Sequence, residues 1–159
     1  MKLKGMTDED FLQYKKPSLL LVFPTCTFKC CIECGSQVCQ NWSLAMAPMM
    51  EVSSDTIIQR YLSNPITQAI VCGGLEPFDS FDELFPFIVS LREDHKCEDD
   101  VVIYTGYKED EIHSYINKLK AYKNIIVKFG RFIPDQDYHH DDILGVDLAS
   151  DNQYAVKIS

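Results

Sequence analysis

The chain has no apolar stretch of the roughly 20 residues that a bilayer requires, and its N-terminus has no apolar signal-peptide core. It also lacks any run of basic residues, because 15 Lys and Arg stand against 24 Asp and Glu, a formal net charge of −9. A surface that follows nucleic-acid phosphates needs clustered positive charge. We therefore expect a cytoplasmic protein that binds neither a membrane nor nucleic acid.

Internal repeats and linker-like segments are also absent from the 159 residues. This length suffices for one domain with a proper core and is too short for two ordinary domains. We expect a single compact domain over residues 1–159. The cysteine count is seven, an odd number, and a reducing compartment disfavours disulfides and leaves thiols available for metals.

Five of the seven cysteines crowd into one segment that directly follows the apolar run 19–23 and Pro24. They are Cys26, Cys30, Cys31, Cys34 and Cys39. Thiols this close together are hard to explain as packing and are typical ligands of a soft metal centre. Cys72 and Cys97 lie far from this segment, and we assign neither as a ligand; Cys72, within an apolar run, is expected to be a small buried hydrophobe.

Apolar runs rich in Val, Ile and aromatic residues predict four strands, at residues 18–23, 69–72, 101–104 and 125–129. Helical patterns lie between them at 54–62, 81–91 and 112–119. The first helix has a possible cap at Ser53 or Ser54, and Ser80 with Glu83 has capping-box spacing before the second. Pro86 should kink or shorten that second helix.

Alternating strands and helices indicate an α/β fold, with a mostly parallel sheet covered by helices. Ligands bind such sheets at the carboxyl ends of the strands. The cysteine segment and the loops 73–77, 105–107 and 130–132 each follow one predicted strand, so all four should meet at one rim. In the C-terminal part, we expect the acidic stretch 135–142 to be a solvated loop that includes the surface pair His139 and His140, and 154–158 to be β-like.

Zinc is one candidate metal, since four Cys or His ligands close a structural zinc site. Zinc modules usually present two short-spaced pairs separated by a dozen or more residues. Here all five thiols share one segment, and Cys31-x2-Cys34 is the only pair with that spacing. A non-catalytic zinc or redox module therefore stays as an alternative to a cluster-binding enzyme.

Six motif blocks occur in a fixed order along nearly the whole chain, from about residue 19 to residue 158. They are Cys26-x3-Cys30, Cys39-Gln40-Asn41-Trp42, Gly73-Gly74-Leu75-Glu76-Pro77, Tyr104-Thr105-Gly106-Tyr107, Gly130-Arg131-Phe132-Ile133 and Ala149-Ser150-Asp151-Asn152-Gln153. In this order and at this short length, the sequence resembles the activating proteins of anaerobic ribonucleotide reductases, which belong to the radical S-adenosylmethionine superfamily.

The resemblance implies a partial, open radical S-adenosylmethionine (β/α) barrel whose cluster-binding loop spans residues 24–42. It also implies two cofactors, a [4Fe–4S] cluster held by three thiolates and S-adenosylmethionine bound at the open iron. Reductive cleavage of the sulfonium would yield a 5′-deoxyadenosyl radical, which would abstract a hydrogen atom from a glycine of the partner reductase. The implied partners are the catalytic subunit of an anaerobic ribonucleotide reductase and an electron donor such as flavodoxin or ferredoxin.

The resemblance assigns Cys26, Cys30 and Cys39 as the cluster ligands, because Cys39-Gln40-Asn41 matches the Cys-x-Asn ending of the family motif. The family spacing is Cys-x3-Cys-x2-Cys, so residues 31–38 then form an insertion. Cys34, alone or with Cys31, is the rival assignment for the third ligand.

The same resemblance assigns cofactor-binding roles to six other residues: Asn41, Gly73, Gly74, Glu76, Thr105 and Lys128. The two glycines would let the backbone approach the methionine moiety, and Glu76 would accept from its ammonium group. Leu75 departs from the family pattern by splitting Gly-Gly-Glu/Asp-Pro. A radical S-adenosylmethionine enzyme acting on another substrate is the second alternative that the sequence leaves open.

Overall fold

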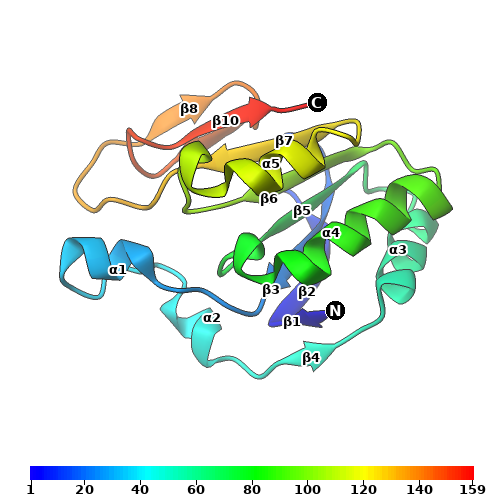
Figure 1. Ribbon diagram of the computed structural model, residues 1–159, viewed down its shortest axis with the longest axis horizontal. Helices are drawn as coiled ribbons and strands as arrows, with labels where there is room; N and C mark the ends of the chain where they lie inside the picture. Colours follow the sequence, from blue (N-terminus) through cyan, green and yellow to red (C-terminus); the bar gives the residue numbers. More distant parts are fainter.

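A computed structural model describes residues 1–159 as one mixed α/β domain built on a six-stranded sheet (Figure 1). The strand order is β10–β7–β6–β5–β3–β2. The strands are β2 (Gly5–Asp10), β3 (Ser18–Phe23), β5 (Ala69–Gly74), β6 (Asp100–Tyr104), β7 (Ile125–Phe129) and β10 (Tyr154–Lys157). The four strands predicted from the apolar runs are confirmed as β3, β5, β6 and β7.

The four central strands are parallel, and both edge strands run antiparallel to their neighbours. Strand β10 corresponds to the β-like run expected at the C-terminus. Strand β2 was not predicted, because its polar sequence carries no apolar alternation; its pairing with β3 makes it a strand. The sheet is open, with β2 and β10 at its edges, and its closure toward a partial barrel stays a prediction.

Three α-helices connect the parallel strands: α3 (Ser54–Ser63), α4 (Phe81–Val89) and α5 (His113–Leu119). They lie where the sequence predicts helices. Ser53 caps α3, since its Oγ accepts a 3.1 Å hydrogen bond from Thr56 N. A 3₁₀-helix precedes α4 at Pro77–Ser80 and another precedes α5 at Glu109–Ile112.

One of the two expectations for the second helix is wrong. Ser80 does not cap α4, because its Oγ lies 2.8 Å from Thr25 Oγ1, while Glu83 accepts a 2.6 Å bond from Lys2 N. Tertiary partners have thus taken both groups of the expected capping box. Helix α4 continues through Pro86 and ends at Val89, two residues before the predicted end at 91, and a π-helical segment, Ser90–Asp94, follows it. The shorter α-helix agrees with the expectation for Pro86.

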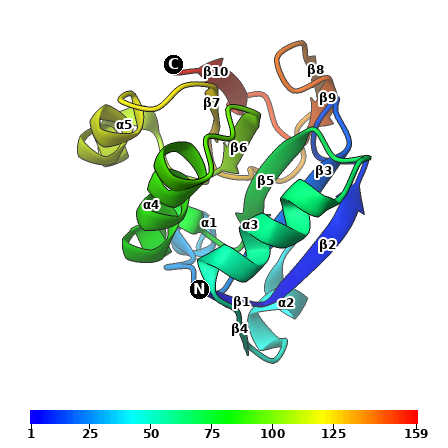
Figure 2. The same ribbon diagram turned by 90° about the vertical axis from the view of Figure 1, so that its right-hand side faces the viewer.

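The helices pack on one face of the sheet only. Each parallel strand lies beside its predecessor on the same side, so crossovers of one hand bring every connecting helix to one face. The 24-residue main core joins helix residues such as Leu84 and Ile116 to Ile70 and Cys72 of β5. Figure 2 shows this arrangement, with the hairpin of β8 (His139–Asp141) and β9 (Val146–Leu148) beyond the other face. The expected helix cover therefore holds for one face alone.

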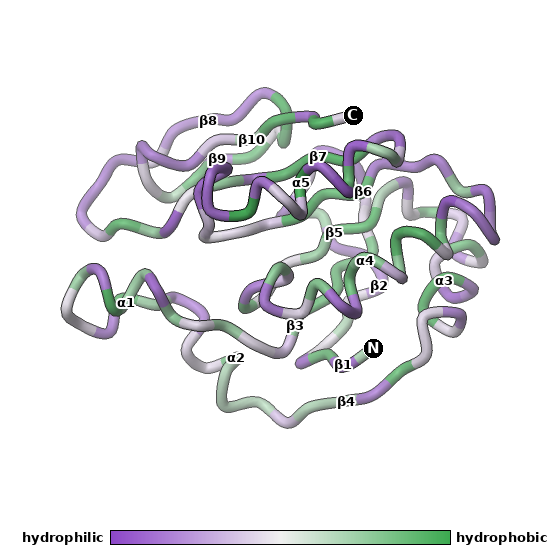
Figure 3. The backbone as a smooth tube through the Cα atoms, in the orientation of Figure 1, coloured by the Kyte–Doolittle hydropathy of each residue, from purple (hydrophilic) through white to green (hydrophobic).

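The opposite face carries a smaller core of eight buried residues, none of which comes from a helix. The hairpin of β8 (His139–Asp141) and β9 (Val146–Leu148) contributes to it. The expectation of a solvated loop at 135–142 is therefore wrong in part. Asp141 accepts 2.9 Å hydrogen bonds from Leu144 N and Ala155 N, which ties this hydrophilic segment (Figure 3) to β10.

Four short elements complete the fold. Strand β1 (Lys2–Leu3) pairs with β4 (Met50–Glu51), and the cysteine segment carries α1 (Lys29–Cys34), with α2 (Trp42–Met46) after it. Cys72 is fully buried, as predicted, and Cys97 is also buried. No helix has the length and apolar character needed to span a bilayer.

Candidate functional site

A cavity of about 490 Å³ opens at the carboxyl ends of the parallel strands, on the sheet face that the helices leave uncovered. This volume lies within the range of small-molecule sites. The cavity is lined by all nine residues to which the sequence assigns a site role: Cys26, Cys30, Cys39, Asn41, Gly73, Gly74, Glu76, Thr105 and Lys128. The expectation that the strand-end loops meet at one rim is confirmed.

Glu76 joins the loop after β5 to the loop after β6. Its Oε1 accepts hydrogen bonds from Thr105 Oγ1 at 2.8 Å and Phe78 N at 3.2 Å, and its Oε2 accepts from Gly106 N at 2.9 Å. Its own N donates to Thr25 O at 2.8 Å, which ties in the loop after β3. Glu76 therefore connects three loops, two through its carboxylate and the third through its backbone N, and Oε2 keeps one acceptor position for a further donor.

Lys128 is a buried cation in the cavity wall. Its Nζ donates to Gly130 O at 2.9 Å, which leaves two ammonium protons without a protein acceptor. Burial lowers the pKa of Lys128 to about 8, although the nearby Glu76 works in the opposite direction. Burial likewise raises the pKa of Glu76 to about 7, against the three donors that favour its ionised form.

The two glycines at the end of β5 differ in backbone conformation and in the space that each has for a side chain. Gly74 has a φ of +90°, and a Cβ there would lie 2.5 Å from Val22 Cγ1 and 3.0 Å from Val22 Cα. Gly73 has no such constraint, because the nearest atom to an added Cβ is Tyr104 Cβ at 3.8 Å. Glycine at position 74 is thus required by the fold itself, whereas position 73 is open toward the cavity.

The structure distinguishes the five clustered cysteines by their position. Cys26, Cys30 and Cys39 line the cavity, while Cys31 and Cys34, on α1, do not. Burial raises the pKa of Cys26 to about 11 and that of Cys30 to about 12, and Cys39 adds to both shifts. A cationic centre beside Cys26 and Cys30 would offset the desolvation that disfavours their ionisation.

Sequence reasoning missed several residues of this cavity. Tyr107 and Arg131 line it, and so does Gln153, whose Nε2 lies 3.3 Å from Gly130 O. All three residues belong to the six motif blocks, so their presence at the site could have been predicted from sequence. Their side-chain types alone did not indicate what each residue does there. The apolar wall could not be assigned either; it includes Leu20, Val22, Val71, Tyr104, Val146 and Leu148.

A known protein family matches most of the chain, including the cysteine-lined wall of the cavity. The profile of the 4Fe-4S single cluster domain family matches residues 18–153. The chain belongs to this family. A 4Fe-4S single cluster domain of this type occurs in radical S-adenosylmethionine iron–sulfur proteins. No curated protein and no solved structure matches the chain significantly.

The residues of the cavity fit the cluster of a 4Fe-4S single cluster domain. No group of three or more Cys, His, Asp or Glu side chains is gathered closely enough to hold one metal ion. A cubane differs from a single ion in this respect, because each cysteine binds a different iron and the sulfurs stand apart. Three thiols spread along one wall, with none of the other cysteines on it, match that ligand pattern.

Proposed function

We propose that this 4Fe-4S single cluster domain is a radical S-adenosylmethionine enzyme that generates a glycyl radical on an anaerobic ribonucleotide reductase. The observation that carries the proposal is one cavity that combines three thiols, a buried ammonium, a glycine-rich strand end and an apolar wall. The cysteines are chemically suited to a cluster, and the other three features suit an amino acid joined to a nucleoside.

In this proposal, Cys26, Cys30 and Cys39 hold the [4Fe–4S] cluster, and Cys34 is the rival third ligand. Bound there, the reduced cluster would supply the one electron needed for reductive cleavage of S-adenosylmethionine to methionine and a 5′-deoxyadenosyl radical. The chain's residues bind, orient and exclude water, as proteins do around reactive cofactors.

In this proposal, three groups of the cavity wall bind the methionine moiety. The two free protons of Lys128 Nζ pair with its carboxylate, and the remaining acceptor position of Glu76 Oε2 takes the ammonium group. Gly73 presents backbone with no side chain in the way. Thr105 acts through Glu76, because its hydroxyl is already donated to that carboxylate.

The protein partner follows from the resemblance, and it remains a proposal, as does the electron donor of the flavodoxin or ferredoxin kind. A glycyl-radical substrate is a whole protein that can itself close the cavity.

The proposal is tested by anaerobic purification followed by iron and sulfide analysis, where about four of each per chain are expected. Dithionite and S-adenosylmethionine should then yield 5′-deoxyadenosine and methionine in equal amounts. Adding an anaerobic ribonucleotide reductase should give a glycyl-radical doublet in its electron paramagnetic resonance spectrum. Cleavage of S-adenosylmethionine without that doublet would indicate a radical enzyme that acts on another substrate. One zinc per chain and no sulfide would indicate the non-catalytic zinc module.

A further inference from the structure

Helix α1 carries Cys30 but has no hydrophobic anchor. None of its six residues is buried, whereas α3 buries Ile57, Ile58 and Tyr61. No side chain caps its N-terminus, where Phe28 adopts a left-handed conformation with φ of 52°. Because apolar packing usually supplies most of a short helix's stability, other contacts must hold α1 in place over the cavity.

The first such contact lies just before α1, at Thr27. Its backbone N donates to Asp79 Oδ2 at 2.7 Å, and Asp79 Oδ1 accepts from Tyr107 Oη at 2.5 Å. Thr27 Oγ1 lies 3.4 Å from the same tyrosine oxygen. Asp79 follows β5 and Tyr107 follows β6, so two strand-end loops jointly hold the residue next to Cys26.

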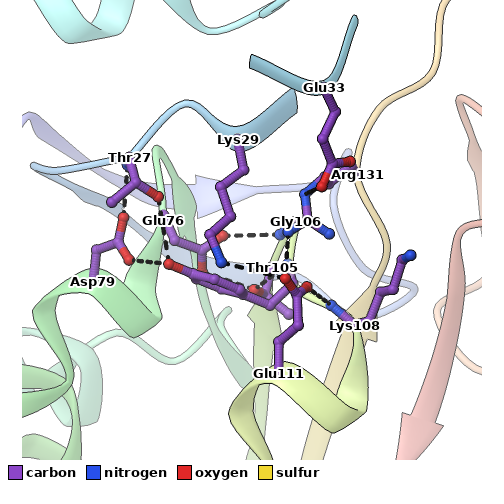
Figure 4. Close-up of polar contacts among 11 residues, drawn as sticks. Thr27, Lys29, Glu33, Glu76, Asp79, Thr105, Gly106, Lys108, Glu111 and Arg131 are labelled. Atoms are coloured by element: carbon purple, nitrogen blue, oxygen red, sulfur yellow. Dashed lines mark hydrogen bonds and ion pairs between the residues drawn. The ribbon is translucent and has the colours of Figure 1, made fainter. Parts of the chain in front are cut away.

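The second contact centres on Glu111, from the 3₁₀-helix after β6. Its Oε1 accepts from Arg131 Nη2 at 2.6 Å and from Lys29 Nζ at 3.2 Å, and its Oε2 accepts from Lys108 N at 2.8 Å. Lys29 also lies 4.4 Å from the ring centroid of Tyr107. Figure 4 shows Lys29 extending from the cysteine segment toward Glu111. The residue directly before Cys30 is thus tied to the loop after β6.

The third contact is made by Arg131, which follows β7 and whose side chain is only 6% exposed. Its Nε lies 3.3 Å from Glu33 Oε1 of α1 but has no hydrogen-bond partner. The guanidinium is held between Glu111 on the strand-end side and Glu33 on the helix side (Figure 4). A planar group with several donors suits such bridging of two carboxylates.

We infer that Glu111 and Arg131 are positioning residues that hold α1, and with it Cys30, at a fixed place relative to Cys26 and Cys39. The inference rests on the proposed function in one respect, namely that these cysteines bind the cluster. Neither residue touches the cluster or the cofactor in this role. They act through Lys29, which directly precedes Cys30, and through Glu33, three residues after it, and they replace the hydrophobic packing that α1 lacks.

The test compares Glu111→Gln, Arg131→Met and the milder Glu33→Gln with a control at an ion pair outside the cavity, that between Arg60 and Asp8. In the metal-free full chain, amide hydrogen exchange in the peptide covering 26–34 should rise by about tenfold in the first two variants, the effect of one lost charged hydrogen bond. Exchange in strands β5–β7 should not change, and Arg60→Met should leave 26–34 as in the wild type. Equal exchange of 26–34 in all variants would overturn the inference.

A second readout comes from the cluster. After anaerobic reconstitution to equal iron content, reduced Glu111→Gln and Glu33→Gln should give cluster spectra with shifted or broadened paramagnetic resonance lines, and Arg60→Met should match the wild type. Spectra identical to the wild type in both α1-contact variants would overturn the positioning role, even if exchange had changed. If the wild type itself takes up no iron and sulfide, the proposed function fails, whereas a change in exchange would still establish the anchoring of α1.

Discussion

Asn41 connects the cysteine segment to the glycine loop, because its Nδ2 donates a 2.8 Å hydrogen bond to the carbonyl oxygen of Gly74. The bond spans 33 positions of sequence and joins the residue two places after Cys39 to the end of β5. The amide thus holds the proposed third ligand beside the proposed cofactor site, as groups behind metal ligands commonly do.

Replacement of Asn41 should remove the link between the cysteine segment and the glycine loop. Asn41→Asp puts a carboxylate oxygen against the Gly74 carbonyl oxygen, and we expect it to lower S-adenosylmethionine affinity by about tenfold or more, whereas Asn41→Ala, which only removes the bond, should lower it less. Equilibrium binding to the reconstituted protein measures both. Equal affinity for wild type and Asn41→Asp would show that the bond does not matter for the cofactor.

The two glycines should respond differently to the same substitution. Gly74→Ala forces an L side chain into a φ of +90° and against the backbone of Val22, so we expect a loss of about 2 kcal/mol or more in unfolding free energy. In Gly73→Ala, the atom nearest to the added Cβ is 3.8 Å away, and the unfolding free energy should stay within about 0.5 kcal/mol of the wild type. Denaturant unfolding of the metal-free chain measures both changes.

The same pair tests the cofactor site. If Gly73 faces the methionine moiety, Gly73→Ala should weaken S-adenosylmethionine binding despite its normal stability. A stable Gly73→Ala protein with unchanged affinity would place the cofactor elsewhere in the cavity.

Lys128 predicts a pH dependence of binding. Its ammonium is charged below a pKa of about 8 and neutral above it, so affinity for a carboxylate ligand such as methionine or S-adenosylmethionine should fall as pH rises past about 8. Lys128→Met should bind more weakly at pH 7 and lose this dependence. Calorimetric titration from pH 6.5 to 9.5 measures it, and parallel pH profiles for the two proteins would rule out the assigned contact.

The unfolding free energy should depend on pH in the opposite direction to the ligand affinity. Between the folded pKa of about 8 and the ordinary value of 10.5, the unfolded chain carries the proton and the folded chain does not. Unfolding free energy of the wild type, relative to Lys128→Met, should therefore rise with pH in this window, by at most about 1.4 kcal/mol per pH unit. A falling difference would mean that burial does not dominate at Lys128.

The cysteines give a direct test of the ligand assignment. Single Ala variants of Cys26, Cys30 and Cys39 should each lose most cluster iron and all 5′-deoxyadenosine formation, because none of the four other cysteines lines the cavity and could replace the lost ligand. Cys31→Ala and Cys34→Ala are the matched controls and should keep both. Activity retained in Cys39→Ala and lost in Cys34→Ala would transfer the third ligand to α1 and leave the enzyme class intact.

Most of the sheet and the membership of the cavity could be predicted from sequence, for one physical reason. Buried parallel strands such as β5 and β7 must be continuous apolar runs, and their carboxyl ends must lie at one edge. The loops that follow them are therefore neighbours in space, whatever their separation in sequence. This is how the loops that begin at Gly73, Thr105 and Gly130 could be assigned to one rim, whereas the place of Lys128, inside β7, came from the family resemblance.

The parts that could not be predicted depend on partners distant in sequence. Strand β2 takes its conformation from β3, and Ser80 gives up its capping role to a contact with Thr25. Arg131 shows the same limit, because a lone arginine after a strand gives no sign of the two carboxylates that receive it. Which side chains pair across loops depends on the assembled fold, so these pairs cannot be predicted from the local sequence.

The order of strands across the sheet, β2–β3–β5–β6–β7–β10, is also their order along the chain. A growing polypeptide can therefore extend the sheet one strand at a time at a single edge, without inserting a later strand between earlier ones. The cysteine segment is synthesised early, directly after β3. The residues that anchor it, Glu111 and Arg131, are synthesised much later. Cluster loading during translation would thus meet an unanchored α1, and insertion of iron and sulfide should be most effective once β7 has joined the sheet.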